Sequence, residues 1–467
     1  MKINFNGSSV FLRLFLTITL ILMFFAPVFA QNNDQINASD LETVLAEASA
    51  LLAKRDYASA LRLFNTLPPE QAQNAEVQLI RASILNASGR TTDSKRIANE
   101  IIAKDNRNTD ALMILADAAA MENKERERRQ FLERVLAVNA SHARALIDLA
   151  NINLKNVNLR GAAAYFDRAL AAEPENGEAL TGRASVYRYS NDYRNAERLL
   201  NRAISIYPQW VRPLHERARL YKGAGYYGDA LNDFAAAIKI EPNDYWTLVD
   251  YGQTLMEINR KTEALDILNK AISVDPEIFM AYVYSAALKD EAGDYSAAEK
   301  DYAKLVKLKP DYYFAAESLG VIKMRNKQWA AARDAFLDAY KQAPKEFSYA
   351  LLAAMNWMRA GRQTDPKQFL AQVIRTAPRD SLDYAMLRLY HDLSGDINVI
   401  EAVDKEKNLY TKSKMLFYLA SYYDIRGNKN LAERYYLMVK DLDTPGTVEW
   451  QLNEIILEER GLNLRKN

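Results

Sequence analysis

Apolar residues recur along most of this chain at the spacing of one face of an α-helix. Two such runs follow one another in the range 211–240: Leu214, Ala218 and Tyr221, then Ala230, Phe234 and Ala237. Polar residues fill the positions between them, so each run predicts an amphipathic helix with one buried face. A glycine-containing turn separates the two runs, and Pro242 follows the second. The local pattern is therefore helix, turn, helix.

This pattern repeats with a fixed period of 34 residues. The prolines that follow the second helix are Pro174, Pro208, Pro242, Pro276, Pro310, Pro344 and Pro378. Proline cannot continue a helix, so each one predicts the end of a repeat. If proline takes the thirty-second place, the repeats start at Ala143, Gly177, Val211, Tyr245, Phe279, Tyr313 and Phe347. The same frame extends back to Leu41, Ala75 and Thr109. A fixed period of this length indicates a repeat architecture.

Several places within the repeat hold one kind of residue. The eighth place is always small, as at Ala184, Gly252 and Gly320, and the twentieth is mostly alanine. The twenty-fourth is mostly large and apolar, as at Phe166 and Phe336. Small residues let two helices approach closely, and the large residue fills the space beside them, so a bulky replacement at a small place should overpack the core. The fifteenth place is often Gly or Asn, which accept the left-handed conformation that ends a helix.

These places together resemble the tetratricopeptide repeat (TPR), which is a helix-turn-helix unit. The range Val211–Asp244 carries the pattern well, and the resemblance extends from Leu41 to about Val448. It implies an all-α fold, a right-handed superhelical solenoid of about twelve TPR-like helix-turn-helix units with a C-terminal capping helix. It also implies a concave groove lined mainly by the first helix of each repeat. Members of the family usually bind peptides or protein segments and seldom catalyse reactions.

The regularity of the repeats sets the expected organisation of the chain. The expected parts are a signal peptide (1–30), a flexible lead-in (31–40), less regular repeats (41–142), the regular array (143–380), a degenerate repeat (381–412), a further repeat (413–448), and a capping helix with a tail (449–467). The frame slips at 381–412 by about two residues, and the alternative for this range is a functionally distinct kink or docking loop. Atypical terminal repeats are expected because one of their faces meets water.

The N-terminus resembles a secretory signal peptide. Lys2 and Arg13 precede the apolar run Leu14–Ala26, and small residues at Val28 and Ala30 predict cleavage after Ala30. The apolar run is shorter than the roughly 20 residues that a membrane-spanning helix needs, which disfavours the alternative of an anchor. We therefore expect an exported protein without a membrane span after cleavage. The periplasm is the expected location, with attachment at the outer membrane or secretion as alternatives.

Composition and motifs narrow the function classes. The 467 residues have a formal net charge of +1, so the electrostatic field of the whole molecule does not favour the binding of nucleic acid. The absence of cysteine excludes disulfides and thiolate chemistry. The three histidines lack the spacing of a zinc-binding motif. The sequence GAGYYG at 223–228 matches the pattern of a dinucleotide-binding loop, but it follows a predicted helix rather than a strand, so it predicts a turn. We expect no catalytic site, no metal and no cofactor.

The candidate site is a partner-binding surface in the concave groove. By analogy with the family, the second, fifth, ninth and twelfth places of each repeat face the groove. The candidate residues at these places are Arg188, Arg212, His215, Arg219, Lys222, Trp246 and Gln253. Arginines bind carboxylates bidentately, so the cations predict an acidic or carboxylate-ended partner segment, with Trp246 as an aromatic anchor. The alternative is an ordinary solvated helix face. The carboxylate clamp of some family members fits poorly, because Ile147, Gly182 and Glu216 occupy places that need polar or basic groups.

Further along the chain the expected groove becomes apolar, at Met280, Val283, Phe314, Leu351 and Met355. These residues suit adaptable protein binding, or are covered by the superhelix itself or by a second copy of the chain. The leading function is an exported, non-catalytic scaffold or adaptor that binds protein or peptide segments. The alternatives are an accessory protein that holds a small molecule or lipid in the apolar part of the groove, and an enzyme with a site assembled from distant repeats.

Overall fold

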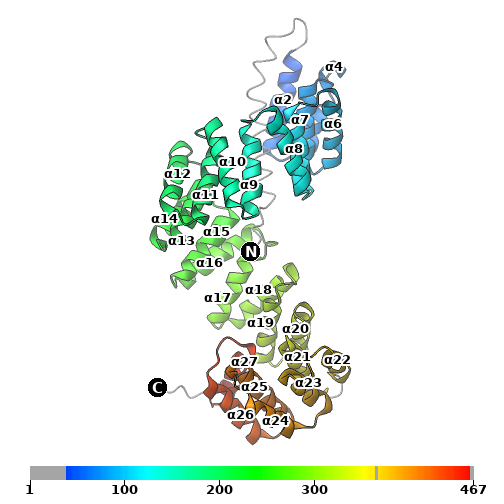
Figure 1. Ribbon diagram of the computed structural model, residues 1–467, viewed down its shortest axis with the longest axis vertical. Coiled ribbons are helices and arrows are strands. Elements are labelled where there is room, and N and C mark those ends of the chain that lie inside the picture. Colours follow the sequence, from blue (N-terminus) through cyan, green and yellow to red (C-terminus); the bar gives the residue numbers. More distant parts are fainter. Residues whose placement is uncertain (1–37, 363–365, 463–467) are drawn as a thin grey trace. The chain divides into compact units, whose positions relative to one another are not determined.

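The computed structural model describes residues 38–362 and 366–462. The expected signal peptide and most of the expected lead-in lie outside the described residues. Within those residues, the regular structure is helical and no strand occurs (Figure 1). The chain forms two compact units, which we call unit 1 (Met1–Glu241) and unit 2 (Pro242–Asn467).

In unit 1, consecutive helices pack as pairs. The pairs are α2 (Ala38–Ala53) with α3 (Tyr57–Leu63), α5 (Ala75–Ala87) with α6 (Thr91–Lys104), α7 (Thr109–Met121) with α8 (Glu125–Val138), α9 (Ala143–Lys155) with α10 (Leu159–Ala172), α11 (Gly177–Tyr189) with α12 (Tyr193–Ile206), and α13 (Val211–Gly223) with α14 (Tyr227–Ile240). The first pair is irregular because its second helix is short: α3 ends at Leu63, and the short α4 (Pro69–Ala72) begins after Pro68.

Unit 2 continues the same scheme. Its pairs are α15 (Tyr245–Glu257) with α16 (Lys261–Val274), α17 (Met280–Glu291) with α18 (Tyr295–Leu308), α19 (Tyr313–Arg325) with α20 (Trp329–Gln342), α21 (Phe347–Arg359) with α22 (Pro366–Ile374), α23 (Leu382–Asp392) with α24 (Asp396–Lys405), and α25 (Leu409–Ile425) with α26 (Lys429–Leu442). The range 381–412 thus contains a shortened helix pair. A final helix, α27 (Val448–Glu459), packs on α25 and α26. The described residues confirm twelve helix pairs and a final helix.

The helix boundaries follow the sequence frame. The first helix of each regular repeat starts at the expected residue, except that α17 starts one residue late, at Met280. At the last place of several repeats, an Asn or Asp side chain accepts a hydrogen bond from the first turn of the next helix, as Asn176 does from the Ala179 amide at 3.0 Å. The fifteenth place takes a left-handed conformation, with a φ of +82° at Gly225 and +58° at Asn191. The turn predicted at 223–228 is confirmed.

The packing places of the repeat form the core. The small residues at the eighth and twentieth places and the large ones at the twenty-fourth are almost all fully buried. Gly320 shows why size matters at the eighth place. A Cβ atom there would lie 2.7 Å from the Phe336 ring, closer than carbon atoms approach without a shift. The two helices of a pair therefore contact one another through residues that the repeat pattern specifies.

In unit 2 the C-terminal helices pack against helices of earlier repeats. Helix α25 packs against α21 and α23, and α27, red in Figure 1, packs against α19. The Tyr418 hydroxyl lies 3.1 Å from the carbonyl oxygen of Ser348 and 2.8 Å from Oε1 of the buried Glu449. The side chains of Leu351 and Met355 are consequently fully buried. Of the alternatives stated for these two residues, the structure supports coverage by the array itself and not an open binding surface.

Candidate functional site

Five of the seven candidate residues lie in unit 1, on α11 and α13. We call Arg188, Arg212, His215, Arg219 and Lys222 the cationic patch. The last four share one face of α13, because they are spaced by three or four residues along one helix. Arg188 is in the last turn of α11, and α11 packs against α13. Pro213 lies in the first turn of α13, where its missing N–H breaks no helical hydrogen bond.

An acidic residue, Glu216, lies in the middle of the cationic patch. Its carboxylate is 3.4 Å from Arg219 and 3.5 Å from Arg188, and the Ser185 hydroxyl donates a hydrogen bond to it at 3.2 Å. Only 17% of the Glu216 side chain is exposed, against 39% for Arg219. Glu216 is therefore a counter-ion shared by the patch and held below its surface.

The electrostatic effect of the patch is visible in the pKa of Glu216. Burial acts to raise this pKa, but the charges of the patch outweigh burial and lower it to about 2. The residues responsible, in order of effect, are Arg219, Arg188, His215 and Arg212. The structure thus brings four of the candidate residues within electrostatic reach of one carboxylate. Lys222 lies one turn beyond Arg219 on the same helix face.

Aromatic contacts fix two members of the patch. The Arg188 guanidinium lies over the Tyr189 ring, 4.5 Å from its centre, and the His215 ring lies 5.8 Å from the buried Phe234 ring. Such contacts restrict side-chain motion before any ligand arrives. The patch is therefore partly ordered by the protein itself.

The remaining two candidates, Trp246 and Gln253, lie on α15 in unit 2. Trp246 is half-buried and contacts the Tyr245 ring edge-on, with 5.2 Å between ring centres. The Gln253 amide donates to Glu257 at 3.4 Å. These residues belong to a different compact unit from the cationic patch, so the joint surface expected from the sequence stays a prediction.

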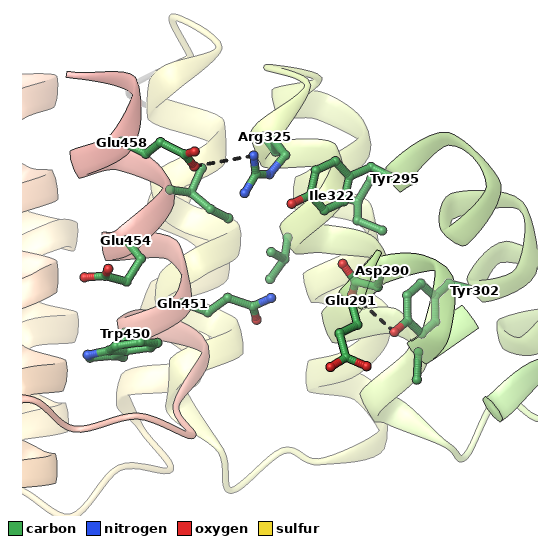
Figure 2. Close-up of a pocket in the computed structure, with 13 residues that line it drawn as sticks. Asp290, Glu291, Tyr295, Tyr302, Ile322, Arg325, Trp450, Gln451, Glu454 and Glu458 are labelled. Atoms are coloured by element: carbon green, nitrogen blue, oxygen red, sulfur yellow. Dashed lines mark hydrogen bonds and ion pairs between the residues drawn. The ribbon is translucent and has the colours of Figure 1, made fainter. Parts of the chain in front are cut away.

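Unit 2 contains a cavity of about 430 Å³, which is lined by residues of α17, α18, α19 and α27. Figure 2 shows Glu291 and Gln451 reaching toward it from opposite walls, and Arg325 above them. The Arg325 guanidinium lies over the Tyr295 ring, 4.2 Å from its centre, and 3.8 Å from the Glu458 carboxylate. The Tyr302 hydroxyl donates to Asp290 at 3.3 Å. The volume is within the range of ordinary ligand pockets.

The sequence can be compared with known families. Two models, both described as tetratricopeptide repeat, match it: one at residues 222–286 and the other at 128–177, 147–211 and 286–347. These ranges lie within the array of consecutive helices that runs from α8 to the start of α21. The chain is a tetratricopeptide repeat protein. No curated protein is similar enough in sequence to count as a relative of this TPR protein.

Several solved structures resemble parts of this TPR protein. PilF of Pseudomonas aeruginosa is 16% identical, with a TM-score of 0.39 over 44% of this chain and 94% of its own. A tetratricopeptide repeat protein from Parabacteroides merdae is 18% identical, with a TM-score of 0.35 over 53% and 98%. MamA from Desulfovibrio magneticus is 18% identical, with a TM-score of 0.33 over 36% and 96%. Each is similar to a part of this chain.

Sequence reasoning missed the role of Glu216. The repeat frame marked it only as unfavourable for a carboxylate clamp. Its spacing contained the signal, since Glu216 is four residues after Arg212 and three before Arg219, which places all three on one side of a helix. The repeat frame placed Arg188 on the same expected surface as the cations of α13, but spacing alone did not predict its contact with Glu216, because Arg188 comes from another helix.

Two further features of the described residues bear on the site. None of their helices combines the length and the apolar character needed to cross a bilayer. Among the same residues, no three His, Asp or Glu side chains are grouped as a metal site requires.

Proposed function

We propose that this TPR protein is an exported, non-catalytic scaffold that binds an acidic segment of a partner protein at the cationic patch. TPR proteins generally mediate protein–protein interaction, which supports the class of function. The observation that carries the proposal is the group of Arg188, Arg212, His215 and Arg219 around one carboxylate. A surface that already binds a carboxylate of its own has the geometry to bind one from a partner.

The chemistry of arginine supports this choice of ligand. A guanidinium carries five N–H donors in a rigid plane and can contact more than one carboxylate. Glu216 orients Arg188 and Arg219 from below, so the partner's carboxylates would meet side chains whose rotamers are already restricted. Restricting these side chains before binding reduces the entropy that is lost on association.

Charge reversal tests the proposal. We expect the Arg212→Glu/Arg219→Glu variant to bind a rhodamine-labelled, acetylated hexaglutamate peptide at least tenfold more weakly than the parent, measured by fluorescence anisotropy at low ionic strength. The control is Arg202→Glu/Lys239→Glu, which makes the same charge change at exposed positions on α12 and α14. It should change the affinity less than twofold. Equal losses in both variants, or no binding of hexaglutamate by the parent, would contradict the proposal.

Export is proposed on the sequence of residues 1–30. We expect the mature chain to begin at Gln31 and to fractionate with the periplasm. N-terminal sequencing of the protein from fractionated cells tests this, and an intact Met1 in a cytoplasmic fraction contradicts it. A photo-crosslinker placed at Lys222, with one at Lys239 as control, would then capture the partner in its own compartment for mass spectrometry.

The alternative of a lipid or small-molecule carrier has little support. It requires an open apolar stretch of groove, yet Leu351 and Met355 are fully buried under α25. Phe314 remains 50% exposed, but one exposed aromatic residue is common on protein surfaces. We therefore propose a protein segment and not a lipid as the ligand.

A further inference from the structure

The final helix, α27, contacts more of the array than its last pair. It packs on α25 and α26, as a capping helix should, and also on α19, which belongs to a pair three pairs before the last one. Across the cavity of unit 2, α27 faces Ala287 of α17 and Val321 of α19, which hold the ninth place of their repeats. The family resemblance assigns this place to the groove. Helix α27 therefore lies where a bound partner segment is expected.

The side of α27 that faces α17 and α19 is loosely packed. The cavity of about 430 Å³ separates it from these helices, and Gln451 reaches into that space from α27 (Figure 2). Two ion pairs cross to α19 and the turn after it: Arg325 with Glu458 at 3.8 Å, and Lys327 with Glu459 at 3.7 Å. The two carboxylate side chains are 67% and 42% exposed, and ion pairs at such positions stabilise a fold little.

Two buried polar atoms of α27 lack a hydrogen bond. The indole Nε1 of Trp450 and the amide oxygen Oδ1 of Asn453 have no partner among the described residues, although the Asn453 amide nitrogen donates to the Tyr436 carbonyl at 3.1 Å. Such atoms regain hydrogen bonds with water when the helix leaves its position. The apolar contacts of Leu452 and Leu457, both fully buried, must offset this cost. The attachment of α27 is therefore less favourable than its buried apolar residues alone suggest.

The two ends of α27 are built for release. Before the helix, Pro445 and Gly446 are exposed, and Gly446 has a φ of +96°, so this short loop can act as a hinge. After the helix, the Arg460 guanidinium binds the Asp424 carboxylate at 2.6 Å. Arg359 approaches the same carboxylate at 3.4 Å. Arg460 can therefore leave without removing the last cation from Asp424.

We propose that α27 is an internal ligand that blocks a docking surface on α19, α25 and α26, and that an amphipathic helix of a partner protein displaces it. This surface lies in unit 2 and does not depend on the function proposed for the cationic patch. The chemistry of the partner helix follows from the helix that it replaces. It has apolar residues at the spacing of Leu452, Ile455 and Ile456, and acidic residues at the spacing of Glu454 and Glu458.

The test holds α27 in place on the full chain. Because the sequence has no cysteine, Lys327→Cys/Glu459→Cys carries the only two thiols, and a short bismaleimide joins them. The same variant capped with N-ethylmaleimide is the control. The probe is a rhodamine-labelled, acetylated peptide of residues 447–461, and its binding is measured by fluorescence anisotropy. We expect the crosslinked chain to bind it at least tenfold more weakly than the capped chain. The same peptide with Leu452→Asp should bind at least tenfold more weakly to the capped chain.

A second variant opens the helix instead. Arg460→Gln removes the contact with Asp424 and should tighten binding of the peptide at least threefold, whereas Arg434→Gln, at an exposed position on α26, should leave it unchanged. Equal binding by the crosslinked and capped chains overturns the proposal, as does unchanged binding by a folded Arg460→Gln variant. Size-exclusion chromatography identifies the occupant. If Arg460→Gln forms a dimer, α27 of a second copy takes the surface and the assignment to a partner protein is wrong.

Discussion

Replacing Glu216 by Gln separates the structural effect of the counter-ion from its effect on binding. In the folded protein the pKa of Glu216 is about 2, against an ordinary value of 4.5. The difference is 4.5 − 2, or about 2.5 pKa units, and each unit corresponds to roughly 1.36 kcal/mol. The ionised form of Glu216 therefore contributes up to about 3 kcal/mol to the stability of the folded chain.

The direction of the pH dependence follows from the sign of this shift. Because the pKa is lower in the folded than in the unfolded chain, the contribution is complete above about pH 5. It is lost as the pH falls from 4.5 toward 2. Glutamine cannot ionise, so the variant lacks this part of the pH dependence. The stability difference between the parent and Glu216→Gln should thus be largest near neutrality and shrink by about 2 kcal/mol on going to pH 3.

Urea unfolding followed by circular dichroism at pH 7, 5, 4 and 3 measures this difference. Glu133→Gln, an exposed carboxylate on α8, is the control and should give a nearly constant difference. At pH 7, the Glu216→Gln variant should also bind hexaglutamate more tightly, because the patch no longer holds a competing carboxylate. A stability difference between parent and variant that is the same at pH 7 and pH 3 would refute the reasoning about the shared counter-ion.

Packing, backbone geometry and buried hydrogen bonds each lead to one stability prediction. Gly182→Ala should lower the free energy of unfolding by about 1–2 kcal/mol, because the added Cβ would lie 2.3 Å from the Phe166 ring. The control is Gly223→Ala, whose Cβ meets nothing within 4 Å and should not destabilise the protein. Thermal unfolding of the two variants measures the difference. Val157→Asn should raise stability by about 1 kcal/mol, since Val157 has a φ of +59° at an exposed turn and asparagine tolerates that conformation; a lower melting temperature would contradict this. Tyr418→Phe should lower the free energy of unfolding, measured with urea, by about 1–3 kcal/mol, because Glu449 and the Ser348 carbonyl lose a buried hydrogen-bond donor. An unchanged urea midpoint would mean that these two hydrogen bonds do not stabilise the fold.

The repeat pattern predicted the helices well because it records contacts between neighbours in sequence. Gly320 and Phe336 are sixteen residues apart and meet across one helix pair, so their sizes are correlated within a single repeat. The same reasoning explains why Asn191 and Gly225 mark turns correctly. Local periodicity contains this information, and no knowledge of distant contacts is needed.

The features that the sequence left open depend on contacts between distant residues. The burial of Leu351 and Met355 follows from α25, which begins more than fifty residues later in the chain. The cavity of unit 2 likewise requires α27 to pack on α19. A repeat frame describes the faces of each helix but not which later helix covers them. For this reason the sequence left open whether Leu351 and Met355 are exposed or covered, and it did not predict the cavity.

The cationic patch holds a group of the protein that has the charge of the expected ligand, since the Glu216 carboxylate lies 3.5 Å from Arg188 and 3.4 Å from Arg219. This resident carboxylate competes with the ligand and also marks the ligand's chemistry. Removing it in Glu216→Gln should therefore tighten binding of acidic peptides and leave binding of basic peptides unchanged. Glu133→Gln changes the net charge by the same amount at an exposed position and should leave the binding of both peptides unchanged. A difference between the two variants thus reports the local charges at the patch and not the net charge of the chain.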